Sequence, residues 1–88
     1  MIIEVDESFK KDFKNLKNEI VQKRVIEKLD EIEKLSNVAE ISNVKKMKGF
    51  DKFYRIRVGD YRIGFELSGE TIIVLRVRSR KDIYNIFP

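Results

Sequence analysis

The chain has 88 residues, enough for one small domain, and it contains no cysteine and no histidine. Disulfides, thiolate or imidazole metal ligands and histidine-based acid–base chemistry are therefore excluded. Residues 1–44 hold 8 basic and 10 acidic residues, whereas residues 45–88 hold 11 basic and 5 acidic residues, so the second half is the expected contact for a polyanion.

The first residues, "MIIEVDESF", lack the basic start and the long apolar stretch of a signal peptide. The longest apolar run, "TIIVL", is far too short to cross a bilayer. We expect residues 1–88 to form a single soluble domain in the cytoplasm, with no membrane contact, no metal and no cofactor.

The first half of the chain predicts a strand followed by two helices. Residues 2–6 read as a short strand, and the apolar residues of segment 8–16 recur every three or four positions, which is typical of a helix that Asp6 or Ser8 can cap. Residues 18–37 form a longer amphipathic pattern. The short link between these two segments predicts an antiparallel helical hairpin.

Residues 38–52 are the least periodic part of the chain. Ile41 and Val44 belong either to a strand or to an anchored loop, and Gly49 ends the segment before the next strand. The segment is also basic, because it contains Lys45, Lys46 and Lys48.

Residues 53–67, "FYRIRVGDYRIGFEL", predict a β-hairpin. Gly59 and Asp60 suit a two-residue turn, because glycine tolerates a positive φ. This turn sets Arg57 opposite Arg62, and Arg55 opposite Gly64, on one face of the sheet. The other face is expected to be buried and comprises Tyr54, Ile56, Val58, Tyr61, Ile63 and Phe65.

The register of the last strand, residues 71–78, decides where its arginines lie. A three-residue loop pairs Leu67 with Thr71 and places Arg76 and Arg78 beside the hairpin arginines, whereas a two-residue loop turns Arg76 into the core. Because an unpaired buried charge is costly, we expect the three-residue loop. That register buries Ile73, Leu75 and Val77 and leaves Ile72 and Val74 on the arginine face.

The order of elements predicts an α+β fold. We expect an N-terminal strand, a two-helix antiparallel hairpin packed on one face of a three- to four-stranded antiparallel sheet, and a short C-terminal tail or helix.

The predicted arginine face indicates contact with nucleic acid. A single arginine on a sheet is usually solvated or paired with an acid, and Glu66 and Asp82 are the candidate partners. The full set outnumbers these acids, and guanidinium groups suit phosphate, while Tyr84 is placed to stack on a base. The set comprises Arg55, Arg57, Arg62, Arg76, Arg78 and Arg80.

RNA carries its own nucleophile, the 2′-OH, beside each phosphate. Arginines can stabilise the charge that develops during its attack, but guanidinium is a poor base. Without histidine, the base must be a lysine, a tyrosine or a carboxylate with a shifted pKa, and Lys46, Lys48 and Tyr84 are the candidates. Composition alone does not establish cleavage.

The segments "KKMKGFDKFYRIRVGDYRIGFEL" and "IIVLRVRSRKDIY" resemble the RelE/ParE superfamily of type II toxin–antitoxin toxins, with "GDYRIGFEL" and "RSRKDIY" as the specific parts. The resemblance implies the RelE branch, whose members cleave mRNA in the ribosomal A site without a metal, by 2′-OH attack. It also implies a RelB-like antitoxin that wraps the toxin in a hetero-oligomer.

By position, the resemblance implies that Arg62 and Arg80 stabilise the transition-state phosphate and that Arg55 and Arg57 hold the substrate, one of them acting as base in some members. Lys46 and Lys48 match a basic segment near the scissile phosphate or ribosomal RNA, and Tyr84 matches a tyrosine that stacks on a base or assists proton transfer. Many relatives have lysine at the positions of Arg55 and Arg57, and histidine at the position of Ser79.

Two other functions stay open at this point. The ParE branch shares the fold and inhibits DNA gyrase, and a basic domain of this kind can also bind RNA without cleaving it. There is also a physical reason to expect an antitoxin. An acidic, partly disordered partner would cover apolar residues and neutralise arginines at the same time. The apolar residues in question are Ile72, Val74, Ile86 and Phe87.

Overall fold

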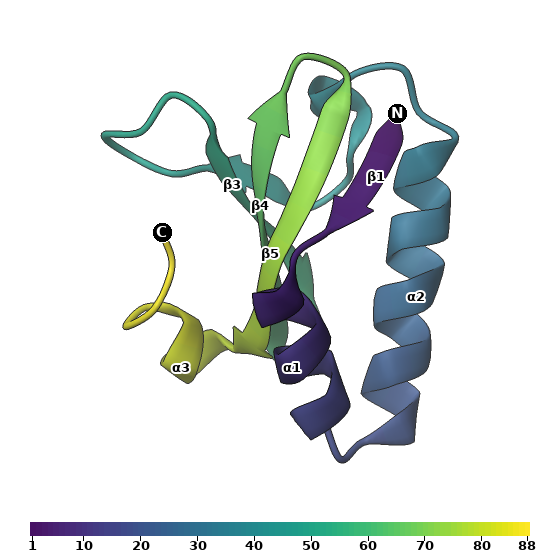
Figure 1. The fold of residues 1–88 in the computed structure, drawn as a ribbon, viewed down its shortest axis with the longest axis vertical. Coiled ribbons are helices and arrows are strands. Elements are labelled where there is room, and N and C mark those ends of the chain that lie inside the picture. The colour runs from purple at the N-terminus through teal and green to yellow at the C-terminus, as the bar shows by residue number, and fades with distance from the viewer.

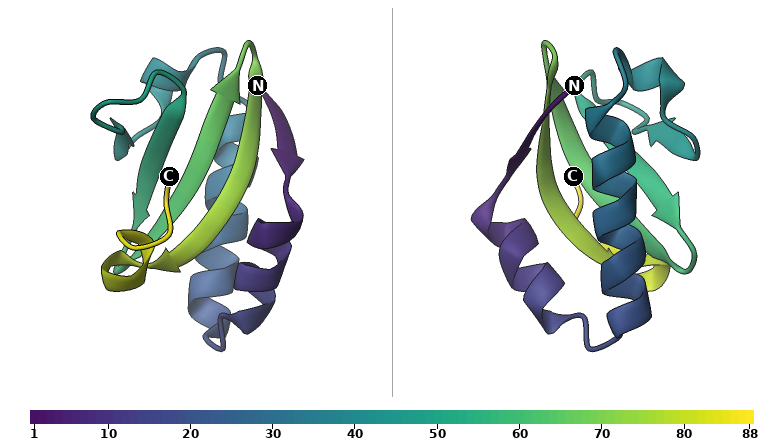
Figure 2. Two further views of the ribbon diagram at one scale, coloured as in Figure 1. Left: turned by 60° about the vertical axis from the view of Figure 1, so that its left-hand side comes forward. Right: turned by 90° about the vertical axis from the view of Figure 1, so that its right-hand side faces the viewer.

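The computed structural model describes residues 1–88 as a five-stranded sheet with two helices on one face and a short helix and tail on the other (Figures 1 and 2). The α+β expectation is therefore confirmed. In chain order the elements are β1 (Ile2–Val5), α1 (Glu7–Asn15), α2 (Glu19–Glu33), a 3-10 turn (Val38–Glu40), β2 (Val44–Lys46), β3 (Phe53–Val58), β4 (Tyr61–Ser68), β5 (Thr71–Ser79) and α3 (Arg80–Ile83).

The sheet has the strand order β1-β5-β4-β3-β2, so the expected three to four antiparallel strands is too few. β2 to β5 are antiparallel neighbours, and β1 adds to β5 in parallel, from Ile2 beside Thr71 to Val5 beside Val74. A parallel pair needs a long connection, and the α1–α2 hairpin is the first part of it. The expected strand near Val44 is β2.

Capping side chains lie at the starts of the two longest helices, and Asp6, one of the two predicted caps of the first, is one of them. The carboxylate of Asp6 accepts a hydrogen bond from the backbone N–H of Ser8, and the side chain of Asn18 accepts from the N–H groups of Ile20 and Val21. The apolar stripe of α2 then faces the sheet, where Val25 and Ile32 are fully buried. The two predicted helices are both present, and residues 16–18 join them.

The β3–β4 hairpin has the predicted register. Val58 pairs with Tyr61 across a two-residue turn, and Arg57 pairs with Arg62. Gly59 has φ of 60°, a backbone conformation that disfavours residues with a side chain.

The predicted register of β5 is wrong. Ser68 pairs with Thr71, so the loop has two residues, and Ile72 and Val74 are fully buried on the helix side instead of lying on the arginine face. A β-bulge then shifts the register within β5. Phe65 pairs with Val74, but Gly64 pairs with Arg76, so Leu75 is an extra residue without a partner on β4. The extra residue shifts the inward and outward alternation of the side chains after it by one position, so Arg76 points away from the core.

The C-terminal tail covers the other face of the sheet. Ile83 and Phe87 are buried there, and a Cβ atom at position 64 would lie 2.8 Å from the Phe87 ring, so only glycine fits beneath it. Phe53 meets Phe87 edge to face, with ring centroids 5.7 Å apart. Four apolar residues were expected to be covered either by the chain's own tail or by a partner, and three of them, Ile72, Val74 and Phe87, are buried within the chain.

Candidate functional site

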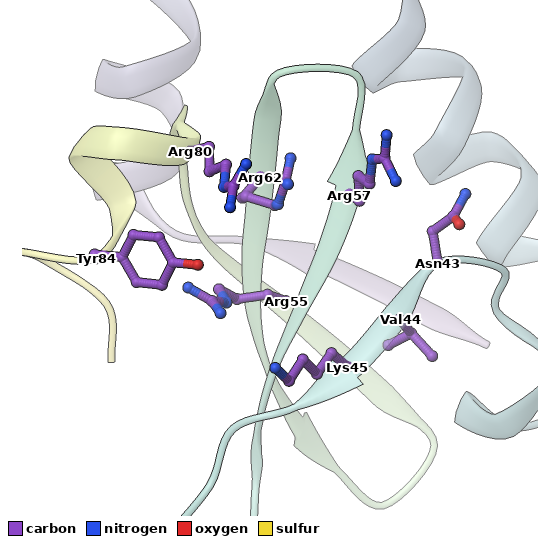
Figure 3. Close-up of a pocket in the computed structure, with 8 residues that line it drawn as sticks. All are labelled: Asn43, Val44, Lys45, Arg55, Arg57, Arg62, Arg80 and Tyr84. Carbon is purple, nitrogen blue, oxygen red and sulfur yellow. The ribbon is translucent and has the colours of Figure 1, made fainter.

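A pocket of about 320 Å³ lies where β2, β3, β4 and α3 meet, and we call it the arginine pocket (Figure 3). Five of its lining residues are cationic and none is acidic. The lining residues are Asn43, Val44, Lys45, Arg55, Arg57, Arg62, Arg80 and Tyr84.

Strand pairing brings the cations of the arginine pocket together. Arg55 and Arg57 are two positions apart on β3, so they share a face, and Arg62 lies directly opposite Arg57 on β4. Arg80 begins α3, where its backbone N–H donates to the carbonyl oxygen of Asp60 at 2.8 Å. This hydrogen bond ties the start of α3 to the β3–β4 turn.

Arg62 is held firmly in the arginine pocket. Its Nη1 donates to the carbonyl oxygens of Gly59 and Tyr61, each at 2.9 Å. The pKa of Arg62 is lowered, first by burial and then by the nearby charges of Arg57 and Arg80. A bound anion would relieve this repulsion.

Arg55 and Tyr84 both line the arginine pocket, where the Arg55 side chain points toward the Tyr84 ring (Figure 3). Arg55 is 8% exposed, and its buried Nη1 has no hydrogen-bond partner. Its guanidinium carbon lies 4.6 Å from the centre of the Tyr84 ring, within cation–π range. The pKa of Tyr84 is lowered from 10.0, because the guanidinium of Arg80, and then that of Arg55, stabilises the phenolate.

Arg76 and Arg78 do not line the arginine pocket, although the sequence places them with its arginines. Asp12 on α1 accepts from Arg76 Nε at 2.7 Å and from Arg76 Nη2 at 3.0 Å, and its Oδ1 lies 3.8 Å from Arg78 Nε. Asp12 also accepts from the backbone N–H of Val77 at 3.2 Å. The pKa of Arg76 is raised, mainly by its hydrogen bond to Asp12.

Lys46 and Lys48 also lie outside the lining of the arginine pocket. Lys46 pairs with Tyr54, whereas Lys45 pairs with Arg55 and therefore shares its face of the sheet. Lys45 and Asn43 are thus site residues that sequence reasoning missed. Strand alternation would have selected Lys45 once the pairing of β2 with β3 was known.

The two acids named as candidate partners of the arginines do not pair with them. Neither Glu66 nor Asp82 forms an ion pair, and the ion pairs of arginine in this chain all involve Asp12. No group of three or more acidic side chains is placed to hold a metal ion. No helix combines the length and the apolar character needed to cross a membrane.

Comparison with known proteins gives consistent results. Residues 3–84 match the family model described as "ParE toxin of type II toxin-antitoxin system, parDE". Toxin RelE3 of Methanocaldococcus jannaschii is 60% identical over 43 residues, which is 49% of this chain and 49% of that protein. The match to this curated relative thus spans about half its length.

Solved structures resemble the whole chain. The RelB–RelE antitoxin–toxin complex from Methanococcus jannaschii contains a chain that is 39% identical, with a TM-score of 0.82, and the match covers 97% of this chain and 99% of that one. The intact RelBE toxin–antitoxin complex of E. coli contains a chain with a TM-score of 0.70 and 22% identity, covering 89% of this chain and 94% of that one. The second likeness shows a shared fold.

Proposed function

Because the chain belongs to the ParE toxin family of type II toxin–antitoxin systems, we propose that it is a toxin of the RelE kind, an endoribonuclease that cleaves mRNA in the ribosomal A site without a metal. The observation that carries this proposal is the arginine pocket. Its five cations converge without a carboxylate, and a phosphate chain is the partner best suited to such a pocket.

The proposed reaction uses the substrate's own nucleophile. The 2′-oxygen forms a bond to the adjacent phosphorus while the bond to the 5′-oxygen breaks, which leaves a 2′,3′-cyclic phosphate and a 5′-hydroxyl. One proton leaves the 2′-hydroxyl and one reaches the departing 5′-oxygen. Arg62 and Arg80 are the proposed stabilisers of the charge on the phosphate oxygens, and Arg55 and Arg57 the proposed groups that hold the strand.

Tyr84 is the proposed proton acceptor. Guanidinium groups keep their protons, which argues against Arg57 in this role. Lys46 and Lys48 stay outside the pocket lining, whereas Tyr84 lies in it and has a lowered pKa. Lys46 and Lys48 keep a proposed role in contacts with RNA away from the reacting phosphate.

We also propose that an antitoxin of the RelB kind binds the chain in a hetero-oligomer. The 39% identical chain is found in a RelB–RelE antitoxin–toxin complex, and the uncompensated charge of the arginine pocket suits an acidic partner. A neighbouring gene for a small acidic protein, followed by co-purification of the two products, would support this.

A gyrase inhibitor is the second candidate, because the matching family model carries the ParE name. One pair of assays separates the two. A cell-free translation reaction, analysed by primer extension on the message, should give new 5′ ends within codons when the protein is added. Supercoiling by gyrase should be unaffected. Inhibited supercoiling with an intact message would favour the second candidate and contradict the first.

A further inference from the structure

The arginine pocket contains a single amine, the side chain of Lys45. The other four cations of its lining are guanidinium groups, and Tyr84 adds a phenol. Lys45 is exposed and forms no ion pair within the chain. The family resemblance gives roles to Lys46 and Lys48 but none to Lys45, so the presence of an amine in the pocket needs its own explanation.

Strand pairing sets the direction in which Lys45 points. Lys45 lies opposite Arg55 and shares its face of the sheet, whereas Lys46 lies opposite Tyr54 on the other face. Figure 3 shows the Lys45 amine and the Tyr84 hydroxyl reaching into the pocket from opposite sides, with the Arg55 side chain between them. The two groups are therefore placed to act on different sides of one bound phosphate.

The proposed cleavage needs a proton donor on the side of the phosphate away from Tyr84. The attacking 2′-oxygen and the departing 5′-oxygen lie roughly in line, on opposite sides of the phosphorus. Tyr84, as the acceptor beside the 2′-oxygen, cannot also reach the 5′-oxygen in the same step. Guanidinium groups keep their protons, whereas an ammonium group gives up a proton more readily. Among the lining residues, Lys45 is thus the cation best suited to donate the proton.

We propose that Lys45 is a catalytic residue that protonates the departing 5′-oxygen. As the bond between phosphorus and the 5′-oxygen breaks, this oxygen takes the bonding electron pair and a proton from Nζ of Lys45. The ammonium group becomes a neutral amine, which regains a proton from water after the products leave. The inference rests on the proposed function and deepens it, because it assigns one step of that reaction.

Sulfur in place of the bridging 5′-oxygen tests this step directly. A thiolate leaves without a proton because thiols are far stronger acids than alcohols, so a message with one such sulfur at the cleavage site bypasses the donor. The cleavage site is first mapped by primer extension. Single-turnover cleavage of the sulfur message and of the ordinary oxygen message is then measured in translation complexes assembled with each.

Lys45→Met should separate the two messages. It removes the proton donor and keeps a side chain of similar length, so cleavage of the oxygen message should slow at least about 100-fold, as for the loss of a general acid. Cleavage of the sulfur message should stay close to the wild-type rate. That rate would also show that the variant is folded and binds its substrate.

Two further variants distinguish the proton from the charge. Lys45→Arg keeps the positive charge but donates a proton poorly, so it should also slow the oxygen message and cleave the sulfur message well. Lys46→Met is the matched control, because it removes the same charge from the neighbouring position, on the other face of β2. Whatever it does to binding, the ratio of its two cleavage rates should equal the wild-type ratio.

Several results would overturn the role of Lys45 while leaving the nuclease in place. They are equal slowing of both messages by Lys45→Met, cleavage of the oxygen message at the wild-type rate by Lys45→Met or Lys45→Arg, and a change of the ratio in Lys46→Met as large as that in Lys45→Met. A wild-type protein that cleaves neither message would instead contradict the proposed nuclease, and the role of Lys45 with it.

Discussion

The sheet carries two groups of arginines with opposite surroundings. Arg55, Arg57 and Arg62 face a pocket with no carboxylate, whereas Arg76 and Arg78, on the next strand, lie around the buried carboxylate of Asp12. Side chains of one type, in the same sheet, thus have different roles. The guanidinium groups of the first group repel one another and have no acidic partner in the chain, whereas the second group joins α1 to β5 through Asp12.

This contrast shows that a count of arginines is a poor guide to a binding face. What matters is whether a carboxylate from another element reaches each guanidinium first. Asp12 is 64 residues before Arg76 in the chain, and it also binds the N–H of Val77 where β1 no longer pairs with β5. The comparison predicts that substitutions in the first group change activity and that substitutions in the second change stability.

Arg62→Ala should have the largest effect on activity. Arg62 is held by two carbonyl oxygens and has no acidic partner, so its loss should lower the single-turnover cleavage rate at least about 100-fold, as for one preorganised donor. Primer extension in a cell-free translation reaction measures this rate. Lys23→Ala, which removes an exposed cation of α2, should cleave like wild type. An Arg62→Ala protein that did the same would remove Arg62 from the mechanism.

Tyr84→Phe should lower cleavage by roughly 100-fold and flatten its dependence on pH. A proton acceptor must be deprotonated, so the wild-type rate should rise with pH and level off above the pKa of Tyr84, which Arg80 and Arg55 hold below 10.0. Single-turnover rates across a pH series test this. Tyr54→Phe is the control, since Tyr54 stacks on Phe65 and lies outside the arginine pocket. If the cleavage rate of Tyr84→Phe rose with pH as much as the wild-type rate does, another group would be the proton acceptor.

Asp12→Ala should act on stability. The substitution removes the partner of Arg76 and leaves the N–H of Val77 unpaired, so the free energy of unfolding should fall by about 2–3 kcal/mol. Urea unfolding followed by circular dichroism measures the change. Asp30→Ala, at an exposed position of α2, should stay within about 0.5 kcal/mol of wild type. A similar small change for Asp12→Ala would mean that the network contributes little to folding.

The sequence predicted the β3–β4 hairpin because all its determinants are local. A glycine with positive φ, a two-residue turn and strict alternation set Arg57 opposite Arg62 without help from the rest of the chain. The same hairpin supplies three of the four arginines of the pocket. Arg80 and Tyr84 were predicted as site residues from the family resemblance, and α3 brings both to the pocket.

The failures of prediction are all non-local. The register of β5 depends on a bulge at Leu75, which lets a two-residue turn coexist with an arginine outside the core. Whether Lys45 or Lys46 lines the arginine pocket depends on how β2 pairs with β3. The binding of Arg76 and Arg78 to Asp12 requires knowing that α1 runs beside the end of β5, which no short stretch of sequence encodes.

Arg57→Gln should have the smallest of these effects, a small loss of RNA affinity. It tests most directly whether the two groups of arginines differ in their contact with RNA. Each phosphate contact to a single strand contributes about 0.7 to the slope of log affinity against log salt. Exposed Arg57 has no acidic partner, so its loss should reduce the slope for a single-stranded RNA by about that amount and weaken binding a few-fold. Arg76→Gln removes the same formal charge, but Asp12 already neutralises that charge, so the slope should hardly change. Fluorescence anisotropy at several salt concentrations compares the two, and equal slopes would mean that both groups contact the RNA alike.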